Sequence, residues 1–167
     1  MPSLFKALLW LCLLFNGALV GVWAQATEPQ AAAAIAITEV SDFDETTWAR
    51  LLQSGPRPAA YLFTTSYCST CPQAFAQLKL AVEQRHIRIP LVAVMMDVGG
   101  TQALRHALHF QGLTRMYAFD GFEPAIRQSV DPAWPNVTPY VVLIDKKGRV
   151  QRSIGPPAPR ALRAWLG

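Results

Sequence analysis

The chain is poor in cysteine. It has 3 cysteines in 167 residues, and one of them, Cys12, lies in an apolar N-terminal segment that we expect to be removed. Cys68 and Cys71 are then the only thiols left, so no spare cysteine remains that could form a wrong disulfide. We therefore expect a chain built for an oxidising compartment.

Internal repeats and low-complexity tracts are also absent. The 13 prolines and 10 glycines are scattered, and residues 38–167 are enough for one domain with a hydrophobic core. The formal net charge is +4, and six basic residues lie between Lys146 and Arg163. No aromatic stripe or nucleic-acid-binding motif accompanies them, which favours a solvated surface over a face that docks nucleic acid or an acidic partner.

Residues 1–24 have the pattern of a secretory signal peptide. Lys6 gives a short positive start, an apolar run follows, and small residues allow cleavage after Ala24 or after Ala26. The apolar run is short for a membrane-spanning helix, which needs roughly 20 residues. An uncleaved anchor is the alternative, and only then would the protein be attached to a membrane. Residues 25–37 are rich in alanine and are interpreted as a flexible linker before the domain.

Hydrophobic patterning predicts an α/β fold. Three nearly continuous apolar runs have the character of strands covered on both faces, and a fourth strand follows a tight Gly148 turn. The predicted strands are Ala59–Thr64, Leu91–Asp97, Tyr140–Asp145 and Val150–Ile154. The predicted helices are Thr46–Gln53, a segment after Cys71 with Phe75, Leu78 and Val82, a segment around Leu104 and Leu108, and Pro159–Leu166. A crossover unit followed by a hairpin predicts one mixed sheet flanked by helices.

Cys68-Ser69-Thr70-Cys71 directly follows the first predicted strand and opens a helix. The helix N-terminus lowers the pKa of a neighbouring thiol, so Cys68 is the candidate nucleophile and Cys71 the candidate resolving thiol. Half of a zinc site and a structural staple are the alternatives. The strand and helix on either side favour redox chemistry, and a bridge that closes so small a loop stabilises a fold little.

Two motifs resemble the thioredoxin superfamily, and within it the exported TlpA-like thiol–disulfide oxidoreductases of bacteria. The first is the segment 63–72, FTTSYCSTCP, and the second is the segment 137–150, VTPYVVLIDKKGRV. The resemblance runs from about Thr38 to the C-terminus and implies a thioredoxin-like fold with a central mixed β-sheet.

The resemblance also implies roles for single residues. Cys68 matches the attacking cysteine and Cys71 its buried partner, and their redox-active disulfide would need no other cofactor. Pro139 matches the cis proline, and Thr138 the residue whose backbone pairs with a substrate chain. Tyr67 departs from the family, since it stands where a tryptophan commonly precedes the first cysteine, but it can still supply a flat apolar platform. The implied partners are periplasmic client proteins with disulfides, such as apocytochrome c or oxidase copper-site factors, and a membrane-embedded thiol reductase as electron donor.

The chain departs from this family where a base should assist the second cysteine. Leu62 occupies the position of the buried carboxylate of thioredoxins, and Ala74 a position where some exported relatives carry glutamate. Asp97, at the end of its predicted strand, is the acid placed to compensate as proton acceptor. Without such a base, resolution of the mixed disulfide should be slow.

For the other candidate residues, a purely structural explanation competes with the functional one. Trp134 precedes the proline motif and either lines the substrate groove or packs as a loop aromatic. His106 and His109 could reach one metal, but no acid or cysteine accompanies them, which favours solvated histidines. The competing function is a thioredoxin-fold copper-handling assembly factor with the cysteine pair as ligands. No histidine follows His109, where such a factor would supply another ligand.

Overall fold

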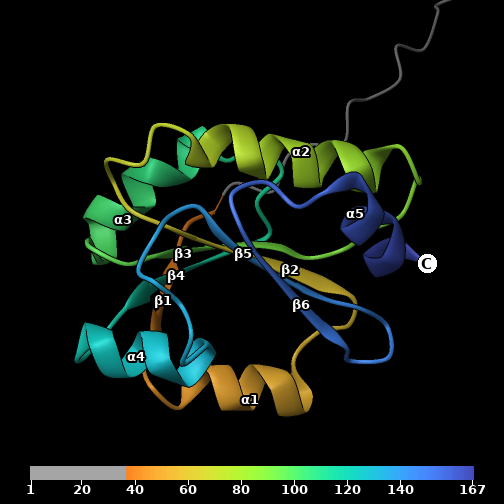
Figure 1. The fold of residues 1–167 in the computed structure, drawn as a ribbon. Coiled ribbons are helices and arrows are strands. Elements are labelled where there is room, and N and C mark those ends of the chain that lie inside the picture. The colour runs from red at the N-terminus through yellow and green to blue at the C-terminus, as the bar shows by residue number, and fades with distance from the viewer. Residues whose placement is uncertain (1–36) are drawn as a thin grey trace, which may run out of the picture. The chain divides into compact units, whose positions relative to one another are not determined.

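The computed structural model describes residues 37–167; the predicted signal peptide and nearly all of the predicted linker lie outside them. Six strands form one mixed sheet in the order β1-β4-β3-β2-β5-β6 (Figure 1). The strands β1, β4, β3 and β2 run parallel to one another, and β5 is antiparallel to both β2 and β6. Their bounds are β1 Val40–Phe43, β2 Ala59–Thr64, β3 Leu91–Met95, β4 Arg115–Phe119, β5 Tyr140–Ile144 and β6 Val150–Ile154.

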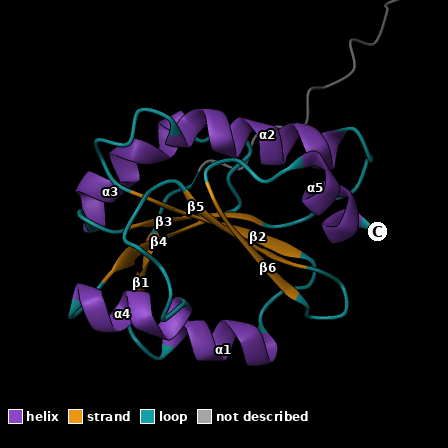
Figure 2. Cartoon of the chain, in the orientation of Figure 1, coloured by secondary structure: helices purple, strands orange, loops and turns teal. Residues whose placement is uncertain are grey.

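Helices cover both faces of the sheet (Figure 2). The helices α2, α3 and α5 lie on one face, and α1 and α4 lie on the other. Their bounds are α1 Thr47–Ser54, α2 Cys71–Glu83, α3 Gly100–His106, α4 Glu123–Val130 and α5 Pro159–Leu166, with a 3-10 turn at Ala107–His109. None of the helices within residues 37–167 is long and apolar enough to cross a membrane.

The strand β2 supplies both hydrophobic cores, because successive side chains of a strand point to opposite faces. Ala60 and Leu62 pack in the core under α2 and α5, whereas Tyr61 and Phe63 pack in the core over α1 and α4. All six residues of β2 are buried. This explains why the sequence shows an unbroken apolar run here, without the alternation of a half-exposed strand.

The predicted α/β class and mixed sheet are confirmed. The strand Ala59–Thr64, the strand Val150–Ile154 and the helix Pro159–Leu166 have the predicted bounds. The strand predicted as Leu91–Asp97 ends two residues earlier, at Met95. The strands β1 and β4 and the helix α4 were not predicted. Leu108, which was predicted to contribute to an apolar helix face, is 81% exposed because α3 ends at His106.

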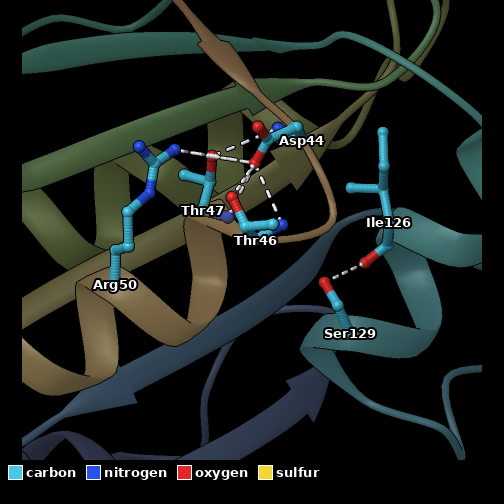
Figure 3. A network of polar contacts seen from close by, with 6 residues as sticks. All are labelled: Asp44, Thr46, Thr47, Arg50, Ile126 and Ser129. Atoms are coloured by element: carbon cyan, nitrogen blue, oxygen red, sulfur yellow. Dashed lines mark hydrogen bonds and ion pairs between the residues drawn. The ribbon is translucent and has the colours of Figure 1, made fainter.

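Asp44 fixes the start of α1 (Figure 3). Its Oδ1 accepts hydrogen bonds from the backbone N–H groups of Thr46 and Thr47 at 3.0 and 2.8 Å, and from their hydroxyls at 2.8 and 2.7 Å. The hydrogen bond from the Thr47 hydroxyl has the largest effect on the pKa of Asp44, followed by the one from the Thr46 hydroxyl, and together they lower it to about 2. Arg50, one turn further on, lies 3.5 Å from the same carboxylate. In α4, the hydroxyl of Ser129 donates to the carbonyl of Ile126.

We expect Asp44→Asn to lower the melting temperature at pH 7, and the loss to shrink on acidification. The folded-state pKa lies below the unfolded value of 3.8, so this carboxylate stabilises the fold above pH 3.8 and loses that effect as the pH falls towards 2. Thermal unfolding at pH 7 and at pH 2 measures the loss of melting temperature in the variant. The control is Glu45→Gln, which removes the adjacent carboxylate. An equal loss at both pH values would contradict the expectation.

Candidate functional site

The two cysteines lie where β2 passes into α2. The last residue of β2, Thr64, accepts a hydrogen bond from the N–H of Met96 at 2.9 Å, which ties the strand end to the chain after β3. The loop then turns, with the Cys68 N–H donating to the carbonyl of Thr65 at 3.2 Å. The N–H of Cys71 donates to the carbonyl of Cys68 at 3.3 Å, and α2 begins at Cys71. Cys68 therefore lies just before the helix N-terminus.

Cys68 and Cys71 form a disulfide, with their Cα atoms 5.5 Å apart. Their environments differ. Cys71 is fully buried, whereas Cys68 is half-buried at the edge of the same core. A reagent or protein from solvent can therefore reach the sulfur of Cys68 before that of Cys71.

The electrostatic setting favours a thiolate at this position. The first turn of α2 contains no acidic residue, so nothing on the helix opposes its positive N-terminal dipole. The hydroxyl of Thr70 lies 3.9 Å from Cys68 Sγ and offers a weak polar contact. A negative charge on Cys68 is stabilised here by the helix, whereas Cys71 is enclosed by apolar side chains.

No carboxylate lies in the core around Cys71. Leu62 and Ala74 are fully buried in the same cluster as Cys71. Within residues 37–167 the single buried acid is Asp145, which holds the hairpin turn through Arg149 at the far end of β5. The core around Cys71 is therefore apolar at both Leu62 and Ala74.

Asp97 anchors the loop that carries the first cysteine. Its two carboxylate oxygens accept the N–H of Ser66 at 2.9 and 3.1 Å, and Oδ2 also accepts the Ser66 hydroxyl at 2.6 Å. Ser66 precedes Cys68 by two residues. The sequence reasoning found Asp97 but missed Ser66, because the contact joins residues 31 positions apart and has no local signal.

The Thr138–Pro139 peptide bond is cis, as is the Arg57–Pro58 bond, which the sequence reasoning did not single out. Tyr140, the next residue, pairs with Phe63 of β2, so the proline lies at the same end of the sheet as the cysteine loop. The carbonyl of Pro139 accepts the N–H of Gly155 at 2.8 Å. Neither the N–H nor the carbonyl of Thr138 bonds to another backbone group in residues 37–167.

A buried aromatic pair supports this proline loop from behind. Trp134 stacks on Tyr140, with ring centroids 4.2 Å apart, and its indole N–H donates to the carbonyl of Val137 at 3.1 Å. The Tyr140 hydroxyl donates to Asp131. Burial first and this hydrogen bond second raise the pKa of Tyr140, and the same hydrogen bond lowers the pKa of Asp131.

Trp134 is only 4% exposed. This is the packed loop aromatic that the sequence left as the alternative, and the prediction that its ring lines a substrate groove is wrong because the ring is used in the core. Its indole holds the carbonyl just before Thr138 in place. Tyr67, in contrast, is 80% exposed, and Val137, which the sequence reasoning missed, is 44% exposed.

The other candidate residues from the sequence are His106 and His109. The rings of His106 and His109 have centroids 5.8 Å apart at the end of α3. Within the described part of the chain, no group of three histidine, cysteine, aspartate or glutamate residues is placed to hold a metal ion.

Comparison with known proteins identifies structural likenesses. No protein-family model matches the chain, and no curated protein matches it. A secreted disulfide oxidoreductase of Mycobacterium tuberculosis, homologous to Escherichia coli DsbE, is 18% identical, with 61% of this chain and 72% of that chain covered and a TM-score of 0.43. StoA from Bacillus subtilis is 19% identical over 65% of this chain and 81% of its own, with a TM-score of 0.44.

The topology of the chain itself decides the fold. A parallel β2-α2-β3 unit is joined through one sheet to the antiparallel β5-β6 hairpin and the closing helix α5. The Cys-x-x-Cys disulfide lies between β2 and α2, and the cis proline lies directly before β5. The chain therefore has the thioredoxin-like fold.

Proposed function

We propose that the protein is a thiol–disulfide oxidoreductase. The observation that carries the proposal is the Cys68–Cys71 disulfide with one half-buried and one fully buried sulfur. A bond between sulfurs three residues apart constrains the unfolded chain little, so a structural role is the weaker explanation.

In the reductive direction, the Cys68 thiolate attacks one sulfur of a client disulfide. A mixed disulfide forms, and the other client sulfur leaves as a thiolate that takes a proton from solvent. Cys71 then loses its proton, for which Asp97 is the proposed acceptor, and its thiolate attacks Cys68 Sγ. The mixed disulfide breaks, and the second client sulfur leaves as a thiolate that takes a proton from solvent. The client gains two electrons and two protons, and Cys68 and Cys71 become a disulfide.

Tyr67, Thr138 and Pro139 are proposed to bind the client. The exposed Tyr67 ring offers an apolar contact beside Cys68, and the free backbone groups of Thr138 can pair with an extended client segment. The contribution of Trp134 is indirect, since it fixes the Val137 carbonyl. Proposed clients are exported proteins with cysteine pairs, such as apocytochrome c or oxidase copper-site factors, with a membrane-embedded thiol reductase returning electrons to Cys68 and Cys71.

The test is reduction of insulin by dithiothreitol, with copper(I) binding to the reduced protein measured beside it. We expect the protein to accelerate insulin reduction and the Cys68→Ser variant not to do so. No acceleration by folded protein, together with stoichiometric copper binding that depends on both cysteines, would overturn the proposal in favour of a copper-handling factor.

We further propose that the protein is exported to the periplasm after cleavage of residues 1–24 or 1–26. The predicted signal and the absence of a third thiol beyond it support this. N-terminal sequencing of the exported protein should then begin at Gln25 or Thr27. A start at Met1 in the membrane fraction would mean that the apolar segment stays as an anchor.

A further inference from the structure

A second site candidate lies at the other end of the sheet. A pocket of about 340 Å³ opens between α1 and the first residues of β2, β3 and β4. The cysteine loop follows the last residue of β2, so the pocket and the disulfide lie at opposite ends of the parallel strands. Its volume falls in the range of small-molecule pockets, which is about 300–1,000 Å³.

The strand register places three polar side chains, those of Tyr61, Arg115 and Tyr117, beside this pocket. Tyr61 pairs with Val92, and Val92 pairs with Arg115, so these side chains form a row across β2, β3 and β4. Tyr117 lies two residues after Arg115 and shares its face of the sheet. Leu51 of α1 and Pro56 of the following loop supply apolar walls. The α1 wall is held at its first turn by the Asp44 network.

The hydroxyl of Tyr61 has an unused hydrogen-bonding capacity. The side chain is 1% exposed, it lines the pocket, and its hydroxyl has no hydrogen-bond partner in the described part of the chain. Burial has the largest effect on the pKa of Tyr61 and, with a smaller effect of the neighbouring Tyr117, raises it to about 12. The positive charge of Arg115 opposes this rise. A buried hydroxyl without a partner destabilises the fold, so a bound acceptor would be favoured here.

Arg115 brings a positive charge to the same place. Its guanidinium lies 5.9 Å from the centre of the Tyr117 ring and donates weakly to the Tyr117 hydroxyl at 3.5 Å. No carboxylate within residues 37–167 makes an ion pair with it. The exposed Arg115 side chain is therefore available to pair with an anion in the pocket.

We propose that this pocket binds a small organic carboxylate with a compact apolar body. The carboxylate accepts hydrogen bonds from the Arg115 guanidinium and the Tyr61 hydroxyl, and the body packs against Leu51, Pro56 and Val92. Charge-assisted hydrogen bonds fix the anion, and the apolar walls exclude fully hydrated inorganic ions.

The test is a titration of the ¹⁵N-labelled protein with benzoate, followed by amide chemical shifts, with neutral benzyl alcohol as the matched probe. We expect saturable shifts in α1 and at the starts of β2 and β4, and binding of benzyl alcohol about 10-fold weaker or more. Arg115→Gln should weaken benzoate binding about 10-fold and Tyr61→Phe about 3-fold or more. Arg105→Gln, an exposed arginine on the helix α3 of the opposite face, should leave it unchanged.

Tyr61→Phe removes a hydroxyl without a partner, so its melting temperature should equal or exceed that of the parent protein. Arg115→Gln changes an exposed side chain and gives a second test should Tyr61→Phe fail to fold. The proposal is overturned by the absence of saturable shifts up to about 50 mM benzoate, which spans the weak affinities expected of so small a ligand. Equal binding of both probes, or parental affinity in Arg115→Gln, also overturns it. Cys68→Ser should bind benzoate as tightly as the parent protein does. The binding result can therefore be interpreted even if the redox proposal fails.

Discussion

Cys68→Ser is expected to reduce thiol–disulfide exchange by about 10³-fold or more, because a serine hydroxyl cannot replace the attacking thiolate. The half-buried side chain makes few core contacts, so the fold should remain. Insulin reduction under identical dithiothreitol concentrations measures the loss, and circular dichroism reports the fold. Retention of activity in this variant would exclude Cys68 as the nucleophile.

Cys71→Ser should behave differently, since it keeps the nucleophile and removes the resolving thiol. Mixed disulfides between Cys68 and a client should accumulate and be visible by non-reducing electrophoresis and mass spectrometry. In the reduced parent protein, iodoacetamide should modify Cys68 first, because Cys71 is fully buried. Accumulation in Cys68→Ser, with first labelling at Cys71, would reverse the two roles.

Ala74→Glu is expected to accelerate resolution of the mixed disulfide about 10²-fold, which is the lower end of general-base catalysis. Ala74 is fully buried in the same apolar cluster as Cys71, so burial should raise the pKa of the introduced carboxyl and make it a proton acceptor near neutral pH. The same burial should cost several kcal/mol of stability. Stopped-flow kinetics on a small disulfide substrate separates attack from resolution.

Ala74→Gln is the matched control, because it has nearly the same shape and cannot accept the proton at neutral pH. A gain in both variants would mean that loosened packing exposes Cys71. If resolution in the parent protein is already fast and neither variant alters it, the proton acceptor lies elsewhere and the missing base has no kinetic consequence.

Asp97→Asn is expected to slow resolution without altering the first attack if Asp97 is the proton acceptor that we propose. Both its carboxylate oxygens are engaged by Ser66, so it also positions the loop before Cys68. Ser66→Ala separates the two roles, since it releases one hydrogen bond and leaves the carboxylate. Equal slowing of attack and resolution in both variants would make Asp97 a positioning residue alone.

The predicted strands that lie inside the sheet are the ones whose burial is uniform, whereas β6, which is partly exposed, was predicted from the Gly148 turn before it. The strands β2, β3 and β5 are buried along their whole length, and such strands appear as unbroken apolar runs. The strand β4 begins with exposed Arg115 and sends Met116 and Tyr117 into different cores, so its apolar signal is mixed. The edge strand β1 has four residues, two of them polar, which is too short for a periodic signal.

The site was predictable where its chemistry is local in sequence. The spacing of Cys68 and Cys71 and their place after a strand were sufficient to identify the pair. The support around it joins distant segments, as Ser66 does with Asp97 and Tyr140 does with Asp131, and such contacts have no pattern along the chain. The substrate role predicted for the Trp134 ring failed because the ring is buried against Phe63 and Tyr140, and its contact with Phe63 joins distant segments.

The reduction potential of the Cys68–Cys71 couple, measured by equilibration with glutathione or dithiothreitol, tests the central claim most directly. Redox-active pairs of oxidoreductases lie at about −270 to −120 mV, whereas structural disulfides typically lie below about −300 mV. We predict one reversible two-electron transition above about −300 mV, with the fold retained in both states. A potential below that value, or unfolding on reduction, would contradict the account and make the disulfide a structural bond.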